Sequence, residues 1–279
     1  MKAQLKTILI LALVFVQFAQ AQSPWTRQKG KAYVQLGFSG IFYDKLESKG
    51  KTVDLPYDVT DITSQVYGEY GITDKLEAQL ILPFKIVSYK GKTTNFSESL
   101  SGIGNVNLGL KYKIFDGNWK ISAGLQYAFN SITKDNVKDL STGFNAETAL
   151  PYITFGTSSG KWYYFGNVGY GYMSNTYSDF FKFSAEVGYS VTEKSHLIFV
   201  LDTKNIVSKE EAFNTDSYQW ASYLDRQSYS AVGLKFNYEF SKDKFGLNFA
   251  ALGAFDLDNA PAAPSFNFGL YSKFKKKNE

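Results

Sequence analysis

Few side chains in this sequence are suited to catalysis, because it contains no cysteine and a single histidine, His196. A serine–histidine mechanism requires the imidazole to lie within hydrogen-bonding distance of the nucleophile. Ser195 is the sequence neighbour of His196, but neighbouring side chains on a strand point to opposite faces. We therefore expect no catalytic residue, and we interpret His196 as a polar side chain beside a short turn at 192–195.

Two further patterns resemble binding motifs without fitting them. Asp54, Asp58 and Asp61 lie in the stretch "DLPYDVTD", and Ca²⁺ prefers such oxygen ligands, but the spacing fits no EF-hand. The glycines of "GIGNVNLG", at 102–109, open a predicted strand, whereas a phosphate-binding loop needs a helix N-terminus. We therefore expect neither a metal ion nor a cofactor, and we interpret the three carboxylates as solvated loop charges.

Strands, rather than helices, must position the polar residues of this chain. In "LEAQLILPFK", at 76–85, every second residue from Leu76 to Phe84 is apolar, and the residues between them include Glu77 and Gln79. Such alternation predicts a β-strand with one apolar and one polar face. The pattern recurs to the end of the chain and gives twelve candidate strands. Two of them, at 149–157 and 196–204, have apolar residues on both faces, so their orientation is ambiguous.

The N-terminus has the three parts of a secretory signal peptide. Lys2 and Lys6 precede a short apolar core, and an A-x-A cleavage signal follows at 19–21. We therefore divide the chain into a cleaved signal peptide, residues 1–21, and one mature domain, residues 22–279. Loss of the two lysines lowers the formal net charge from +4 to +2, which is too near neutral to indicate nucleic acid as a partner.

The connections between predicted strands alternate between short turns and longer segments. Turns of three or four residues follow every second strand, whereas the longest connections lie at 44–59, 90–101, 131–145 and 205–224. A soluble β-sandwich also uses short turns, but strands of about 10 to 12 residues match a tilted crossing of a bilayer. The sequence therefore predicts an all-β fold, a transmembrane antiparallel up-and-down β-barrel of about 12 strands, in the bacterial outer membrane.

The charged residues on the polar faces of the strands are expected to point into the barrel lumen. Glu69 and Glu77 should meet lysines of the next hairpin at the same depth, because side chains on neighbouring strands can pair. We expect a cluster in the periplasmic half that acts either as an ion-pair brace or as the lining of a weakly selective channel. The candidate lumen-lining residues are Glu69, Glu77, Lys85, Lys111, Lys113, Lys120, Glu186, Lys235 and Glu239.

Two segments resemble a known family. "YGITDKLEAQLILPF", at 70–84, and "SGIGNVNLGLKYKIF", at 101–115, occur in that order, one hairpin apart. They resemble signature segments of the outer-membrane family associated with the meta-pathway of phenol degradation, with Asn105 where that family usually has aspartate. The resemblance covers about 66–115, and the wider texture is similar to outer-membrane proteins of Bacteroidetes-type bacteria. It implies a small barrel that moves hydrophobic compounds and carries no catalytic residues.

The predicted function is a channel or transporter for passive passage of small solutes, including hydrophobic ones. Two alternatives stay open: a plugged barrel with a structural or surface-interaction role, and a barrel enzyme that acts on lipid. The expected partners are outer-membrane lipids, the barrel assembly machinery and a small solute, with no role for nucleic acid.

The last predicted strand ends on an aromatic residue, the feature by which assembly machinery recognises a barrel. Phe274 closes its apolar face, and residues 275–279 extend beyond it. We predict that Phe274→Ala lowers the amount of protein in the outer membrane, whereas deletion of 275–279 leaves it unchanged. Immunoblots of membrane fractions measure both. Wild-type levels of Phe274→Ala would contradict the assignment of Phe274 as the assembly signal.

Overall fold

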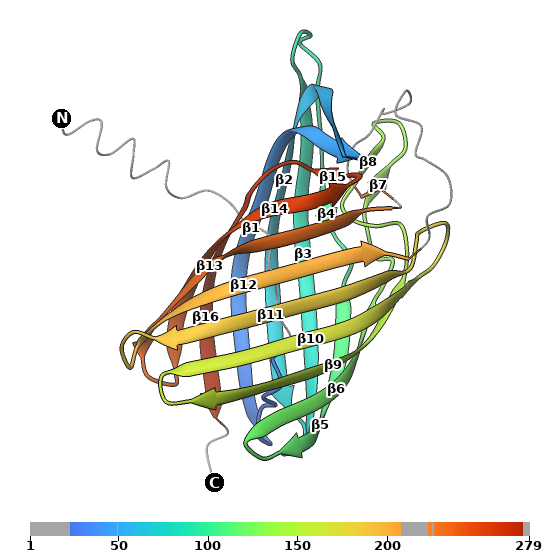
Figure 1. Cartoon of the computed structure of the whole chain (residues 1–279). Helices are drawn as coiled ribbons and strands as arrows, with labels where there is room; N and C mark the ends of the chain where they lie inside the picture. The colour runs from blue at the N-terminus through green and yellow to red at the C-terminus, as the bar shows by residue number, and fades with distance from the viewer. Residues whose placement is uncertain (1–22, 49, 208–222, 225, 276–279) are drawn as a thin grey trace, which may run out of the picture.

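The wall of the molecule is a single closed sheet. The computed structural model describes residues 23–48, 50–207, 223–224 and 226–275, so the predicted signal peptide lies outside the described residues. Twelve antiparallel strands form the barrel, with β4 and β5 sharing one place in the wall (Figure 1). The wall strands are β1 (Lys31–Ser48), β2 (Lys51–Gly71), β3 (Leu76–Gly91), β4 (Ser97–Ile103), β5 (Asn107–Asp116), β6 (Trp119–Ala128), β9 (Thr148–Ser159), β10 (Trp162–Met173), β11 (Phe180–Ser190), β12 (Ser195–Ile206), β13 (Ser228–Ser241), β14 (Phe245–Asp258) and β16 (Ser265–Lys275).

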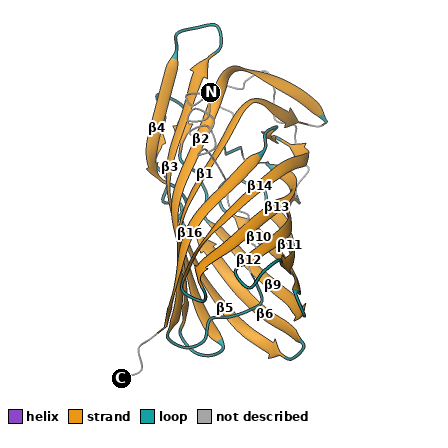
Figure 2. Cartoon of the chain, turned by 90° about the vertical axis from the view of Figure 1, so that its left-hand side faces the viewer, coloured by secondary structure: helices purple, strands orange, loops and turns teal. Residues whose placement is uncertain are grey.

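The barrel closes between the first and last wall strands. β1 pairs with β2 along nearly its whole length and with β16 from the Lys31–Lys275 pair to the Phe38–Phe268 pair. The strands run obliquely round the barrel (Figure 2). Three short strands lie outside the wall order: β7 (Lys134–Asp135) pairs with β8 (Leu140–Ser141), and β15 (Ala260–Pro261) pairs with the end of β1. The predicted fold class and strand number are confirmed.

The apolar face of each strand points outward. On β3, Leu80, Leu82 and Phe84 are 37%, 41% and 46% exposed, whereas Glu77 and Gln79 are buried inside the barrel. The described residues contain no helix long and apolar enough to cross a membrane.

The structure also settles the two ambiguous strands. On β9, Ile153 and Phe155 point outward; on β12, Leu197 and Phe199 do so. Ile198 and Val200 of β12 are therefore buried inside the lumen.

Two of the expected loops, 44–59 and 90–101, are largely strand, which corrects the predicted strand length of about 10 to 12 residues. β2 has 21 residues, and the β1–β2 and β3–β4 hairpins project beyond the rest of the barrel (Figure 2). The inward residues of this extension, including Leu55, Tyr57 and Val59, pack with Leu140 of β8 in a buried apolar cluster. The cluster buries the apolar inner face of the two projecting hairpins. This burial stabilises strand pairing in the part of the barrel that extends beyond the membrane.

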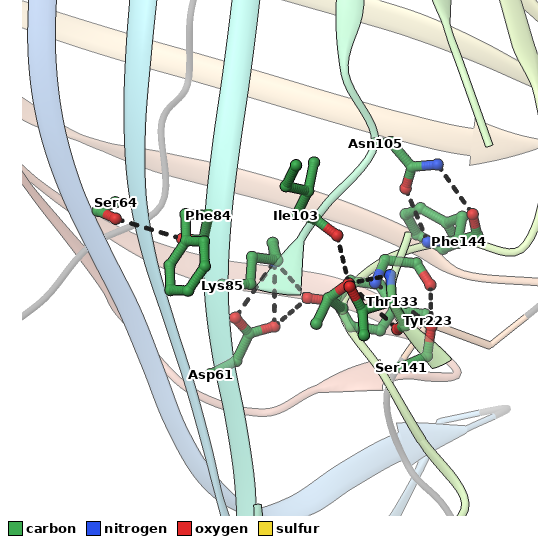
Figure 3. A network of polar contacts seen from close by, with 12 residues as sticks. Asp61, Ser64, Phe84, Lys85, Ile103, Asn105, Thr133, Ser141, Phe144 and Tyr223 are labelled. Atoms are coloured by element: carbon green, nitrogen blue, oxygen red, sulfur yellow. Dashed lines mark hydrogen bonds and ion pairs between the residues drawn. The ribbon is translucent and has the colours of Figure 1, made fainter. Parts of the chain in front are cut away.

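The wall is interrupted between β4 and β5. β4 pairs only with β3, and β6 ends at Ala128. Carbonyl oxygens of β4 accept instead from the segment that follows β6, where Thr133 and Thr142 donate to the Ile103 carbonyl. Asn105, in the break, donates to the carbonyl oxygens of Phe129 and Phe144 at 3.0 and 2.9 Å and accepts from the Phe144 amide at 2.9 Å. Figure 3 shows the bonds between Asn105 and Phe144. An ionised aspartate can accept but cannot donate, so the asparagine suits this position.

A charge test distinguishes the lipid face from the lumen face. Arginine at a lipid-facing midplane position costs ~2–4 kcal/mol, so we expect Leu80→Arg to lower the free energy of unfolding by about that amount. Asn237→Arg, which faces the larger lumen cavity described below, should have a much smaller effect. Denaturant titration of barrels refolded into lipid vesicles measures both variants. Equal losses would contradict the assigned facing.

Candidate functional site: the barrel lumen

Residues 23–29, here called the N-terminal segment, enter the lumen beside the short turns of the barrel. Lys111 Nζ donates to the carbonyl oxygens of Ser23 and Trp25 at 3.0 and 3.2 Å. Ser122 Oγ donates to the Pro24 carbonyl at 2.8 Å. The segment continues directly into β1, whose first residues pair with the end of β16. It therefore fills part of the periplasmic half of the lumen.

A buried charge cluster holds this segment in place. Glu77 and Lys111 form a 2.9 Å ion pair in which both side chains have no exposed surface. The Arg27 amide donates to Glu77 at 2.7 Å, and the Arg27 Nε donates to Glu69 at 2.6 Å. Tyr67 also donates to Glu69, at 2.6 Å. Two carboxylates and two cations thus balance one another, as buried charges require.

An aromatic contact fixes the other side of the segment. The Trp25 ring meets the rings of Tyr163 and Phe165 edge-on, with centroids 6.1 and 6.0 Å apart. Two wall glycines allow the close approach. A Cβ at Gly71 would lie 2.1 Å from the Gln28 carbonyl oxygen, and one at Gly156 would lie 2.9 Å from Pro24. A larger side chain at Gly71 would push the segment away from the wall, and one at Gly156 would also collide with Tyr164 and Phe165 of β10.

Of the nine candidate lumen residues, only Glu69, Glu77 and Lys111 come together in the expected cluster. Lys113 and Lys120 pair with Asp116 at the β5–β6 turn, at 2.7 and 2.6 Å. These ammonium groups lower the pKa of the Asp116 carboxyl to about 2 through hydrogen bonds and charge. Lys85 lies in the outer half of the barrel, where it pairs with Asp61 at 3.2 Å. The expected grouping of Lys113 and Lys120 with the two glutamates is therefore wrong.

Asp61 and its two acidic neighbours do not form a loop cluster. Asp61 points into the lumen, where Lys85 and the Tyr223 hydroxyl contact it (Figure 3). Asp54 and Asp58 lie on the opposite face of the same strand, as the alternation of β2 requires, and Asp54 pairs with Lys45 at 3.1 Å. Our interpretation of Asp61 as a solvated loop charge is therefore wrong.

The remaining candidates line the opposite wall. Lys235 pairs with Glu186 and Lys273 pairs with Glu239, each across the inner face of the sheet. The lumen also contains a Lys182–Asp202 pair at 2.6 Å. As in the buried cluster, each of these charged groups has an oppositely charged group as its nearest polar partner.

Two adjoining cavities occupy the space that the N-terminal segment leaves. The larger cavity, of about 570 Å³, is bordered by the segment itself and by the inner faces of β1, β2, β9–β14 and β16. The smaller cavity, of about 240 Å³, lies toward the outer end, and Leu252 lines both. Lys204 lines the smaller cavity, with its Nζ 4.6 and 4.7 Å from the ring centroids of Phe144 and Phe180.

An apolar patch interrupts the polar lumen. Five inward-facing residues on β12, β13 and β14 pack together and are at most 9% exposed, with Tyr163 and Tyr229 at the margin. Three strands thus present apolar side chains on both faces at this level, which explains the ambiguous periodicity of β12. We refer to this set as the apolar patch. Its members are Ile198, Val200, Ala231, Ala250 and Leu252.

His196 has a serine partner, but not its sequence neighbour. Ser190 on β11 is its direct cross-strand neighbour, and Ser190 Oγ lies 3.0 Å from His196 Nδ1 in the wall of the larger cavity. Among the described residues His196 forms no ion pair with a carboxylate. The pair therefore lacks the third group that orients the base in a serine hydrolase.

Sequence reasoning missed the N-terminal segment. Trp25 and Arg27 lie within six residues of the predicted cleavage site. An aromatic residue and a cation so close to the mature N-terminus are the one sequence signal that could have indicated a docked segment. Its anchor Ser122 gave no signal, because a serine on the polar face of a strand is expected in any lumen.

The fold and its outward apolar surface define the protein as an outer-membrane β-barrel. The chain belongs to the family described as "Putative MetA-pathway of phenol degradation", whose profile matches residues 25–269. This match confirms the resemblance seen in 70–84 and 101–115. No curated protein matches the sequence.

Solved structures show the same architecture. The COG4313 outer membrane channel from Pseudomonas putida F1 is similar with a TM-score of 0.66 and 17% identity, over 92% of this chain and 98% of that chain. The translocator domain of the autotransporter NalP from Neisseria meningitidis is similar with a TM-score of 0.50 and 9% identity, over 89% of each chain. At these identities the likeness concerns the fold.

Loss of one member of the buried pair should be costly. Lys111→Met leaves the Glu77 carboxylate without its cation, and breaking a buried ion pair costs ~3–5 kcal/mol. We expect denaturant titration of the refolded barrel to show a loss of that size.

Two controls accompany this variant. The double change Glu77→Gln with Lys111→Met should recover most of the loss, because no charge is then left unpaired. Lys113→Met, at the rim, should change stability by less than about 0.5 kcal/mol. A double variant as unstable as Lys111→Met alone would contradict the pairing.

Proposed function

We propose that the protein is an outer-membrane channel for passive passage of small, uncharged solutes with an apolar body. The observation that carries the proposal is the pair of adjoining cavities inside a closed barrel, with the apolar patch on one wall and paired charges on the others. Similarity to a structure described as an outer membrane channel supports the same class of function, and the family description names phenol degradation.

The charge pattern of the larger cavity favours uncharged solutes. Its carboxylates are Glu69, Glu186 and Glu239, and each is paired with one of the three cations on the same walls, Arg27, Lys235 and Lys273. Such a wall offers little net field to attract an ion and replaces little of the hydration that an ion must lose. An apolar solute loses no such hydration and gains contact with the apolar patch.

The N-terminal segment is positioned to control the periplasmic end of this path. Ser23, Trp25 and Arg27 all line the larger cavity, so any displacement of the segment widens the route. Its anchors are hydrogen bonds, one ion pair and the two ring contacts of Trp25, and none of them is covalent. We therefore assign the segment the role of a partial plug.

A plugged barrel with a structural or surface-interaction role is the alternative. The fully buried Glu77–Lys111 pair favours it, because a segment tied to such a pair can be a permanent part of the core. We do not assign an enzymatic activity, because the Ser190–His196 contact lacks an orienting carboxylate among the described residues. The partners that this proposal requires are outer-membrane lipids and the barrel assembly machinery.

Replacement of residues 23–29 by glycine and serine, at unchanged length, tests the proposal. The change removes Trp25 and Arg27 and with them the aromatic contact and the Glu69 ion pair. In planar bilayers we expect low conductance from the wild type and several-fold higher conductance from the variant.

Lys29→Ser, which alters an exposed residue of the same segment, is the matched control and should conduct like the wild type. A glycine–serine variant that folds but stays closed would overturn the channel proposal and support the plugged barrel. Uptake of a small aromatic alcohol by porin-deficient cells expressing the wild type then tests the solute class.

A further inference from the structure

Asn267 differs from the other polar side chains of the larger cavity. It lies on the inner face of β16, lines the cavity and is 4% exposed. Neither its amide oxygen nor its amide nitrogen has a hydrogen-bond partner in the described part of the chain. A buried amide without partners is costly, and most buried polar groups in proteins are satisfied. Both amide atoms are also covered by the protein, so a turn of the side chain toward the cavity would offer this unused hydrogen-bonding capacity to a molecule there.

The neighbouring polar groups are already engaged. Asn248 on β14 donates to the Gln35 side-chain oxygen at 2.9 Å, and the Tyr33 hydroxyl donates to the same oxygen at 2.5 Å. The charges of the cavity are also paired, so each of these groups has at least one partner, whereas the Asn267 amide has none among the described residues. Asn267 can therefore offer one donor and one acceptor that are not already engaged.

Asn267 also borders the apolar patch. Ala250, a member of the patch, is its direct cross-strand partner on β14. Leu252, the next inward residue of the same strand, belongs to the patch and lines the same cavity. One end of a bound molecule can therefore reach the Asn267 amide while its body lies on Ala250 and Leu252.

We propose that Asn267 and the apolar patch form a binding site for a small uncharged molecule with an apolar body and one hydroxyl or carboxamide group. Such a group both donates and accepts, which matches the free amide. The 570 Å³ cavity lies within the size range of ligand sites in proteins, about 300–1,000 Å³. This inference rests on the proposed function and deepens it, because it names the residue that selects among apolar solutes.

Trp25 provides a reporter, since it lies in the wall of the same cavity. In the full-length chain, Trp119, Trp162 and Trp220 are changed to Phe, and the barrel is purified in detergent. The probes are 4-bromobenzyl alcohol, 4-bromotoluene and 4-bromobenzoate, because bromine quenches tryptophan fluorescence on contact. A second chain that retains only Trp162, which is exposed on the outer surface, measures partition of the probes into the micelle.

We expect saturable quenching of Trp25 by the alcohol at a concentration about tenfold lower than for bromotoluene, and none by the benzoate. Asn267→Leu should remove the preference for the alcohol and leave the protein at least as heat-stable as the wild type, because it deletes an unpartnered group. Asn267→Ala is a second variant with the same expectation. Asn167→Leu, a buried lumen asparagine outside both cavity linings, is the matched control and should keep the preference.

Equal affinities for the alcohol and bromotoluene in the wild type would overturn the site and would show that only water meets the Asn267 amide. An unchanged preference in Asn267→Leu, or tighter binding of the benzoate, would overturn it as well. Selective binding without solute passage would overturn the channel function alone. Passage that does not depend on Asn267 would overturn this site alone.

Discussion

A sheet inside a bilayer has no water to satisfy its backbone, so every peptide group at its edges must find a partner within the protein. Pairing of β1 with both β2 and β16 meets this requirement for the wall as a whole. The exception is the break between β4 and β5, where strand pairing fails. There the Asn105 side chain takes over the role of a strand by bonding the backbone of 129–147.

Closure creates a second problem, because it encloses charged side chains inside the barrel, where many of them are buried. The protein meets it with ion pairs. Glu77–Lys111 and Asp61–Lys85 form between neighbouring strands, whereas Arg27 reaches Glu69 from outside the sheet. Each pair offsets the cost of desolvating its two members. The larger cavity is therefore bordered by paired charges, whereas the smaller one is also lined by Lys204, whose ammonium group lies over the rings of Phe144 and Phe180.

The fold was predictable because alternation reports directly which face of a strand is apolar, as it does from Leu76 to Phe84. The depth at which a charged side chain lies in the lumen could not be predicted in this way. Lys113 and Lys111 have the same facing, yet the first pairs at a turn and the second in the core. Alternation of apolar and polar residues carries no information about a segment that is not a strand. The binding of Trp25 inside the lumen therefore could not be predicted from the sequence pattern. Strand extension beyond the bilayer was missed because Leu55 and Val59 were read as part of a loop.

Neither the pairing of backbone groups nor the neutralisation of enclosed charges requires the apolar patch in the lumen. A water-filled or ion-paired interior needs no buried Ile198 or Val200, and inward apolar residues on three adjacent strands leave part of the barrel without hydrogen-bonding groups. The outer cluster around Leu140 belongs to the extended hairpins, and the members of both sets are at most 9% exposed. The patch instead borders the larger cavity, with Trp25 and Phe165 among the residues that line the same space. This place beside the cavity is the feature on which our proposal of an apolar solute rests.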